Sequence, residues 1–178
     1  VFMSDSTGNM DIWKVPVGGP GKPVLYERTP EYEVNGEISP DGRWMACMGT
    51  ARGKTMLEIL SFPDPGIRYQ VSIDPPPALS TPMWSPDGLR ILFSSNRSGG
   101  FDVYTKSASG TGQEELLIEM GTATGAAVDW SRDGRWILYQ MPGPKTGQDL
   151  WIAPQFPEGA GGDRKPLPYL QAQFDEQD

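Results

Sequence analysis

The sequence predicts an all-β fold of the β-propeller class, with about four blades of four-stranded antiparallel sheet. One turn sequence occurs three times, as SPDGRW at 39–44, SPDGLR at 85–90 and SRDGRW at 131–136, and successive copies are 46 residues apart. A period in the forties built of short strands is typical of propeller blades. The 178 residues include 22 Gly and 18 Pro and no long apolar stretch, so the composition predicts many turns, very little helix and no membrane-spanning helix.

We expect a single propeller domain over residues 1–178. The repeats divide it into a partial blade at 1–29, three blades at 33–75, 79–121 and 124–170, and a tail or the start of a next blade at 171–178. The opening segment VFMSDSTGNMDIW aligns with the middle of a blade, from its second strand onward. The chain is therefore expected to hold three full blades and most of a fourth, and to be part of a longer propeller.

The blade at 79–121 shows the expected order of elements most clearly. Its four strands are predicted at Thr81–Trp84, Ile91–Ser94, Val103–Lys106 and Glu115–Ile118. The third strand opens with an acidic, an aliphatic and an aromatic residue, DVY, and the same pattern appears as DIW at 11–13 and DLW at 149–151. The blade at 33–75 keeps the alternation of strands and turns but lacks this tripeptide.

Each Asp-Gly pair is predicted to lie at the centre of a tight hairpin between the first two strands of a blade. Such a hairpin places its central residues at positive φ, where Gly fits freely and Asp is tolerated. Arg132 stands where the other two turns have Pro40 and Pro86, so proline helps this turn without being required. Three residues before each turn Asp is an apolar residue expected to fill one buried position per blade: Ile38, Trp84 and Trp130.

The candidate binding residues are Glu37, Met83 and Asp129, which stand four residues before the turn Asp in successive blades. They belong to the innermost strand, and the period-two alternation of a strand directs them to the face opposite the apolar position. One interpretation is that they are hydrated or pair with Arg or Lys of a neighbouring blade, as most surface polar residues do. The other is that they line a ligand-binding surface.

The residue types present exclude several kinds of chemistry. The chain has no His, so neither a Ser-His-Asp nor a Cys-His arrangement can be assembled, and zinc sites of the usual kind are excluded as well. Its one Cys, Cys47, is predicted to be a buried structural thiol. Asp11, Asp102 and Asp149 begin third strands, where they are expected to bond loop amides; a calcium site is the weaker alternative because their spacing is not that of a calcium loop. We predict no catalytic residue, no metal and no cofactor.

Repeats that read WSPDG…ILFSSNRSGGFDVY resemble the TolB-type, WD40-like propeller repeat of bacteria, and the resemblance spans nearly the whole chain. It implies a six-bladed ring, of which 178 residues supply only a portion. The segment from 131 onward also resembles propellers attached as sensor regions to bacterial membrane-anchored Ser/Thr kinases. These resemblances imply an extracytoplasmic location, in the bacterial periplasm or at the cell exterior.

Two functions are compatible with these observations. The first is a non-catalytic scaffold or sensor module that binds a protein or a small molecule. The alternative is the substrate-gating propeller of a prolyl-oligopeptidase-like hydrolase, because similar propellers precede that catalytic domain; this chain contains no GxSxG motif.

The charge of the chain restricts its partners. The net charge is −8 and Lys and Arg are scattered, which excludes nucleic acid and disfavours an anionic membrane surface. Exposed strand edges predict edge-to-edge self-association, or else continuation of the propeller in a longer chain.

Overall fold

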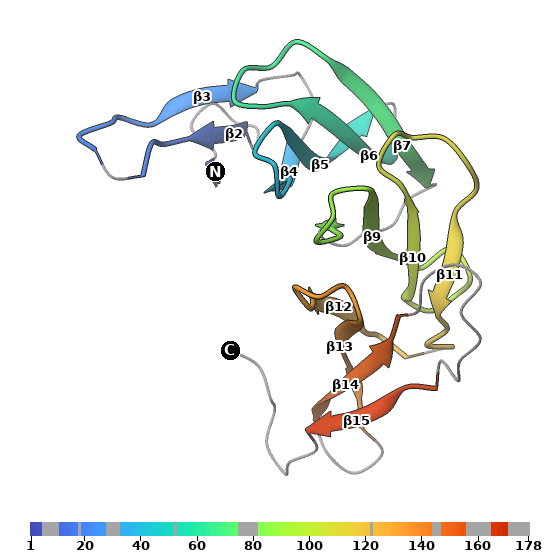
Figure 1. The fold of residues 1–178 in the computed structure, drawn as a ribbon. Helices are drawn as coiled ribbons and strands as arrows, with labels where there is room; N and C mark the ends of the chain where they lie inside the picture. The colour runs from blue at the N-terminus through green and yellow to red at the C-terminus, as the bar shows by residue number, and fades with distance from the viewer. Residues whose placement is uncertain are drawn as a thin grey trace.

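The computed structural model describes residues 1–4, 11–17, 19–27, 33–51, 53–74, 82–121, 123–143, 147–155 and 165–170. Their regular elements are all β-strands, which form four antiparallel sheets. Figure 1 shows the sheets following one another around an arc, with the N-terminus on its concave side. In the part of the chain so described, no helix is long and apolar enough to cross a membrane. The predicted all-β propeller fold is confirmed.

Each sheet is a meander whose strands pair in chain order. The first sheet has three strands: β1 (Phe2–Ser4), β2 (Asp11–Lys14) and β3 (Val24–Glu27). The second consists of β4 (Glu33–Ile38), β5 (Trp44–Ala51), β6 (Lys54–Ser61) and β7 (Arg68–Asp74). The third consists of β8 (Met83–Trp84), β9 (Arg90–Ser95), β10 (Asp102–Ser107) and β11 (Glu115–Ile118). The fourth consists of β12 (Ala126–Trp130), β13 (Trp136–Pro142), β14 (Gln148–Pro154) and β15 (Leu167–Leu170).

The strands of the third sheet agree closely with the prediction. The predicted second and third strands lie inside β9 and β10, and the predicted fourth strand coincides with β11. The first strand is shorter than expected, since only Met83 and Trp84 pair with β9, while Thr81 lies outside the described residues. In each sheet the first strand lies toward the concave side of the arc and the last toward its convex side, as β4, β7, β12 and β15 show in Figure 1.

The second sheet is buried on both faces because its neighbours cover it on either side. On β5, Met45 and Cys47 belong to the core shared with Ile12 of the first sheet. Ala46 and Met48 alternate with them and belong to the core shared with the third sheet. Alternate residues of one strand therefore fill two different cores, as the period of two requires. Cys47 is fully buried, as predicted.

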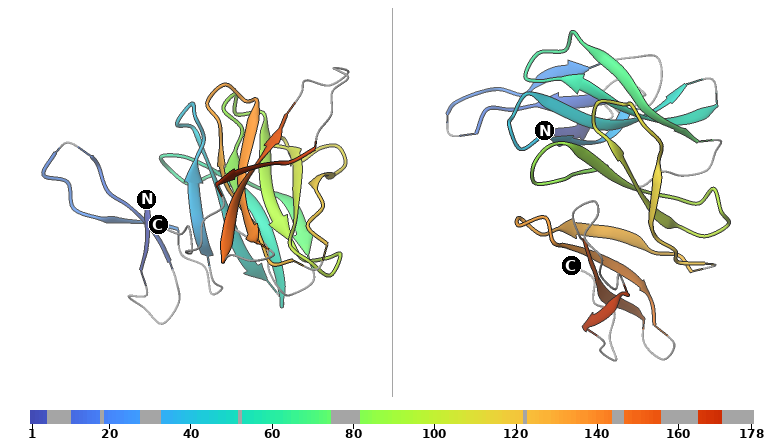
Figure 2. Two further views of the ribbon diagram at one scale, coloured as in Figure 1. Left: turned by 90° about the horizontal axis from the view of Figure 1, so that it is seen from below. Right: turned by 45° about the vertical axis from the view of Figure 1, so that its right-hand side comes forward.

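The third sheet repeats this arrangement toward the fourth. On β9 and β10, Phe93 and Tyr104 face the second sheet, whereas Leu92 and Val103 pack against Tyr139 of the fourth sheet. Figure 2 shows the resulting stack, in which adjacent sheets cover one another face to face. The apolar cores thus lie between the blades and leave the innermost strands to line the concave surface.

The three Asp-Gly turns have the same structure, but it is not the predicted one. In the first, the Gly42 amide donates to the Ser39 carbonyl, and the Asp41 carboxylate accepts bonds from the Ser39 hydroxyl and the Arg43 amide. Only the glycine has positive φ, 71° at Gly42, and the aspartate does not. The expectation that Asp is chosen for tolerance of positive φ was wrong. Asp is needed because its side chain bonds the hydroxyl and amide of the loop, as Asx-turns do.

The three copies of this turn contain the same hydrogen bonds. The bond from the serine hydroxyl to the aspartate is 2.6 Å at Ser39, 2.6 Å at Ser85 and 2.7 Å at Ser131. Each serine oxygen also accepts the amide five residues further on. The loop between the paired strands is therefore longer than a two-residue hairpin, and the serine is as much part of it as the Asp-Gly pair.

The expected buried apolar position is fully buried only in the third sheet. Trp84 lies in the core between the second and third sheets, whereas Ile38 and Trp130 are partly exposed. Trp130 packs against the core between the third and fourth sheets, but its indole edge reaches the concave surface, where it donates to the Gly134 carbonyl at 3.2 Å. One position of the repeat thus has different surroundings in different blades.

Candidate functional site

The candidate residues Glu37, Met83 and Asp129 lie on β4, β8 and β12, the innermost strands of three successive sheets. Glu37 is paired with Ala46 and Met83 with Leu92, and these partners face the next sheet along the chain. Directly paired residues share a face of a sheet, so Glu37 and Met83 point toward the following sheet. The neighbouring apolar positions point the other way, as the alternation predicted.

All three candidate residues line a single cleft on the concave surface, which we call the inner cleft. Its volume is about 330 Å³. The remaining lining residues are two prolines and an arginine from the turns and two tryptophans from the innermost strands: Pro40, Pro86, Arg132, Trp84 and Trp130. The structure therefore brings together residues that are 92 positions apart in the sequence, from Glu37 to Asp129.

Glu37 joins two blades and has an unusual environment. Its Oε2 accepts the main-chain amide of Trp84 at 2.9 Å, and its own carbonyl accepts the Trp84 indole Nε1 at 3.0 Å. Burial raises the pKa of Glu37 to about 7, opposed by the Trp84 amide and assisted by the negative charge of Asp129. One interpretation of this residue was hydration or pairing with Arg or Lys of a neighbouring blade. The two bonds that link the sheets here come instead from a backbone amide and an indole.

Met83 and Asp129 complete the inner cleft on the side of the fourth sheet. Met83 is partly buried and packs against the core between the third and fourth sheets. Asp129 is exposed, and its Oδ1 accepts the Trp130 amide at 2.8 Å. A flexible thioether and an accessible carboxylate therefore face the same space, which allows apolar contact and charge recognition side by side.

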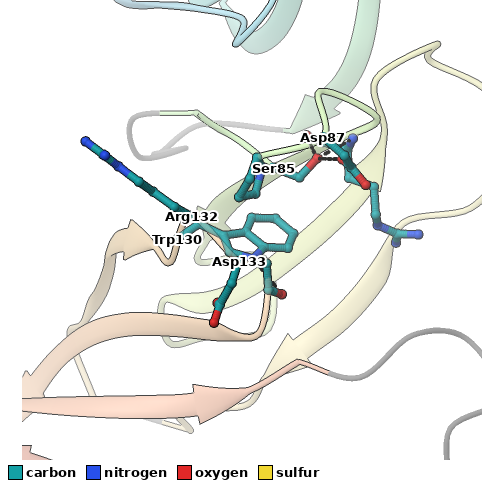
Figure 3. A pocket seen from close by; sticks show the side chains of 8 residues that line it. Ser85, Asp87, Trp130, Arg132 and Asp133 are labelled. Atoms are coloured by element: carbon teal, nitrogen blue, oxygen red, sulfur yellow. Dashed lines mark hydrogen bonds between the residues drawn. The ribbon is translucent and has the colours of Figure 1, made fainter.

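A second cleft of about 330 Å³ lies between the turns of the third and fourth sheets. Figure 3 shows its labelled side chains, with Trp130 between the two turns and Arg132 extending away from Asp87 and Asp133. Pro86, Trp130 and Arg132 line both clefts, so the two form a continuous surface. The residues that line it include tryptophan and proline rings together with several charged side chains.

Arg132 is a lining residue of both clefts that sequence reasoning missed. It was interpreted as a tolerated replacement of proline in the turn, because its main-chain position is equivalent to Pro40 and Pro86. In the structure it is exposed and lines both clefts. One signal could have identified it: Arg132 replaces proline at a position of the repeat whose backbone conformation suits proline.

The turn carboxylates accept hydrogen bonds from residues of their own loops. Hydrogen bonds from Ser39 and Arg43 lower the pKa of Asp41 to about 2, and bonds from Ser131 and Arg135 do the same for Asp133. The pKa of Asp87 is lowered for the same reason. These groups remain ionised near neutral pH and already accept several hydrogen bonds, so they are poor candidates for proton transfer.

The Asp102 carboxylate also accepts hydrogen bonds within the protein. It is buried, its Oδ1 accepts the Met120 amide at 2.6 Å and its other oxygen accepts the Ser98 hydroxyl. The sequence predicted bonds to loop amides; the loop contributes a hydroxyl, and the amide comes from the residue beyond β11. Across the described residues, no group of three or more Cys, Asp or Glu side chains is arranged to hold a metal ion.

No family model matches the sequence. TolB from Acinetobacter baumannii has a similar structure, with a TM-score of 0.73 and 19% identity over 85% of this chain and 37% of that protein. A protein of Agrobacterium tumefaciens described as TolB gives a TM-score of 0.67 and 24% identity over 80% of this chain and 50% of the other. A prolyl endopeptidase gives 0.64 and 15% identity over 92% of this chain and 26% of the enzyme.

The chain thus spans 37% and 50% of the length of these two TolB proteins. At such identities the likeness concerns the fold, and the resemblance of the repeats to the TolB type is confirmed at that level. The chain has the β-propeller fold found in TolB proteins.

Proposed function

We propose that this chain is a non-catalytic β-propeller module that binds a ligand in the inner cleft and acts as a scaffold or sensor domain. The observation that carries the proposal is the convergence of Glu37, Met83 and Asp129, from three different sheets, on one cleft. A rigid stack of sheets that presents strand ends and turns to a shared cleft is a common way to build a binding surface.

The lining of the inner cleft favours a protein ligand that offers an extended segment. Trp84, Trp130 and the two prolines provide apolar walls, and tryptophan and methionine are frequent at sites that bind protein segments. Glu37, Asp129 and Arg132 add charges of both signs at the same place, which suits a peptide better than a purely apolar small molecule.

The proposed location is extracytoplasmic. It is supported by the TolB-type character of the repeats and by the structural likeness to TolB proteins. A fusion of the reading frame that encodes this chain to a reporter active only outside the cytoplasm tests the location. Activity of the reporter supports it, and its absence together with an expressed fusion contradicts it.

Selection from a library of random peptides displayed on phage tests the binding function. We expect the wild-type protein to enrich peptides whose affinity falls about tenfold in Met83→Ala, because that substitution removes an apolar wall of the cleft. Met56→Ala is the matched control, since Met56 is also a partly buried methionine but lies on β6 away from the cleft. Equal loss in both variants, or no enrichment, would contradict the proposal.

The alternative function is that of a propeller that gates access to a hydrolase domain. It is supported by the likeness to a prolyl endopeptidase, which covers 92% of this chain. The reading frame that encodes the chain distinguishes the two functions: a GxSxG motif followed by an acidic residue and a histidine favours gating. In either case we expect the purified chain to hydrolyse no peptide or ester substrate.

A further inference from the structure

One arginine at the concave surface differs from the other arginines of the described residues. Five of those six arginines form an ion pair with a carboxylate: Arg43, Arg68, Arg90, Arg97 and Arg135. Arg132 is the sixth, and in the part of the chain that the structure describes it forms no ion pair. Its side chain is exposed, in a protein whose net charge is −8. The charge of Arg132 is therefore available to a group outside the chain.

The turn of the fourth sheet places Arg132 in the wall of the inner cleft. It occupies the position that Pro40 and Pro86 have in the two preceding turns, and all three residues line that cleft. The turn itself is unchanged, because the Ser131 hydroxyl still donates to Asp133 at 2.7 Å and accepts the Trp136 amide at 2.9 Å. The arginine therefore alters the surface that the turn presents and leaves the bonding of the loop as it is in the other copies.

The turn carboxylates near Arg132 are bonded to other groups. Asp133 follows it in the sequence, but its two oxygens accept bonds from the Ser131 hydroxyl and from the Arg135 guanidinium, each at 2.7 Å. Asp87 lines the second cleft and accepts bonds within its own turn. Figure 3 shows Arg132 extending away from both Asp87 and Asp133. The hydrogen bonds of each turn orient its carboxylate, so the guanidinium is left without a partner from these turns.

An apolar surface lies beside this charge. Trp130 and Pro86 line both clefts together with Arg132, and Figure 3 shows Trp130 between the two turns. The Trp130 indole donates to the Gly134 carbonyl at 3.2 Å, and its ring packs against the core between the third and fourth sheets, so its position is fixed. A fixed ring next to an unpaired guanidinium suits a ligand that carries an apolar group next to a negative charge.

The surroundings of Arg132 favour a carboxylate over a phosphate. A phosphate group carries nearly two negative charges, and proteins that recognise it typically use clusters of arginines. Here Asp87 and Asp133 line the same cleft, and its other basic residue, Arg90, is already paired with Glu115 at 2.7 Å. A single unpaired guanidinium among carboxylates matches a group with one negative charge. Its planar fork can donate two parallel hydrogen bonds to a carboxylate.

We propose that Arg132 anchors an acidic side chain of a peptide ligand, and that an apolar side chain next to that acid packs on Trp130. The proposal rests on the proposed binding function and specifies the class of ligand. Asp129, in the inner cleft, repels a second acidic residue, so the acid of the ligand lies on the side of Arg132 and the segment that enters the inner cleft is neutral or basic. The order of charges along the peptide thus sets its direction across the two clefts.

A double-mutant cycle tests this proposal with peptides that the wild-type protein enriches from a random library. Each acid of such a peptide is replaced in turn by its amide. For one acid we expect the amide peptide to bind the wild type about fivefold more weakly, as for an exposed ion pair. Arg132→Gln should bind both peptides equally. Arg43→Gln is the matched control, because it removes the same charge from an exposed turn residue outside both clefts. Equal melting temperatures of Arg132→Gln and the wild type would show that the fold is kept.

The outcomes separate this proposal from the binding function on which it rests. A difference between acid and amide peptides that disappears in Arg132→Gln and persists in Arg43→Gln supports the anchor. Enriched peptides that bind equally well without any of their acids, or that lose the same affinity in all three proteins, overturn the anchor and leave the binding function standing. Tighter binding of a peptide with phosphoserine in place of the acid overturns the assignment to a carboxylate. If no peptide is enriched, the binding function is contradicted, and the anchor with it.

Discussion

The carboxylates of the turns and the Glu37 carboxylate of the inner cleft come from the same repeat, yet they behave in opposite ways. Asp41 and Glu37 are four residues apart on either side of the end of β4. The pKa of Asp41 is lowered to about 2 and that of Glu37 is raised to about 7. The contrast shows that the surroundings of an acid, which follow from its position in the repeat, decide its role.

The physical difference between the two lies in solvent and in hydrogen bonds. Asp41 is exposed and accepts hydrogen bonds from a hydroxyl, an amide and a guanidinium, all of which favour the charged form. Glu37 loses water on burial and faces another negative charge at Asp129. The turn aspartates are also identical in all three copies, whereas the inner position varies between Glu37, Met83 and Asp129. The uniform position therefore has a role in turn structure, and we propose a role in ligand binding for the variable one.

The largest effect on the turns is expected from Gly134→Val. Gly134 has φ 73°, and a Cβ added there would meet no atom within 4 Å, so the cost comes from the backbone conformation alone. We expect a loss of about 1–3 kcal/mol in the free energy of unfolding, because a β-branched residue is strained at positive φ. Denaturant unfolding measures it. Asp133→Asn keeps an acceptor oxygen in the same turn and should cost much less; equal losses would show that the glycine conformation is unimportant.

Ser85→Ala tests whether the serine is an integral part of the turn. The buried Ser85 hydroxyl donates to Asp87 at 2.6 Å and accepts the Arg90 amide at 2.9 Å. Its removal is expected to cost about 1 kcal/mol, the usual net value of a hydrogen bond, and to bring the pKa of Asp87 back toward its ordinary range. Denaturant unfolding and carboxyl NMR titration measure the two effects. An unchanged midpoint would mean that the Asp-Gly pair alone defines the turn.

The inner cleft should show its own dependence on pH. The pKa of Glu37 is higher in the folded protein, about 7, than the ordinary value of 4.5, so the folded state binds the extra proton. Stability should therefore decline as pH rises from about 4.5 to about 7 and level off above that range. Glu37→Gln keeps an acceptor for the Trp84 amide and should remove this decline. Melting temperatures across this range provide the measurement, and an identical decline in the variant would contradict it.

The turns should show the opposite dependence in more acidic solution. The pKa values of Asp41 and Asp133 are lowered from 3.8 to about 2, so their contribution is present above pH 4 and is lost as pH falls toward 2. The double substitution Asp41→Asn, Asp133→Asn should flatten this acid limb of the stability curve and leave the limb above pH 4.5 unchanged. Urea unfolding between pH 2 and 5 measures the slope. The effect is expected to be the smallest of the four, because both side chains are exposed.

The fold could be predicted from the sequence because the evidence for it is local and repeated. A 46-residue period, an Asp-Gly turn and short apolar runs define each blade, and β9, β10 and β11 lie where those signals indicated. The reason for Asp in the turn was wrong, since its partner Ser39 was part of the repeated sequence but was not interpreted as a hydrogen-bonding group.

The site could be predicted only in part. Alternation along a strand was enough to predict that Glu37, Met83 and Asp129 share a surface, because the position of a residue relative to the turn sets the face it occupies, and all three line one cleft. Their role in binding stays a prediction. The bond from the Trp84 amide to Glu37 joins residues 47 apart and exists only when two sheets are stacked. Arg132 was missed because its access to the cleft depends on Trp130 and Pro86 beside it. Contacts between blades cannot be predicted from the local sequence pattern of one blade.

The most direct test of the contrast between turn and cleft is the affinity of one selected peptide for two matched variants, Asp129→Asn and Asp41→Asn. Both replace an exposed aspartate by its amide, one in the inner cleft and one in a turn. For a peptide that carries a basic residue, we expect Asp129→Asn to lower the affinity about fivefold without a change in the melting temperature of the protein. Asp41→Asn should leave that affinity unchanged and lower the melting temperature. The reverse pattern, with affinity lost in Asp41→Asn and retained in Asp129→Asn, would contradict the assignment of binding to the cleft and of structure to the turn.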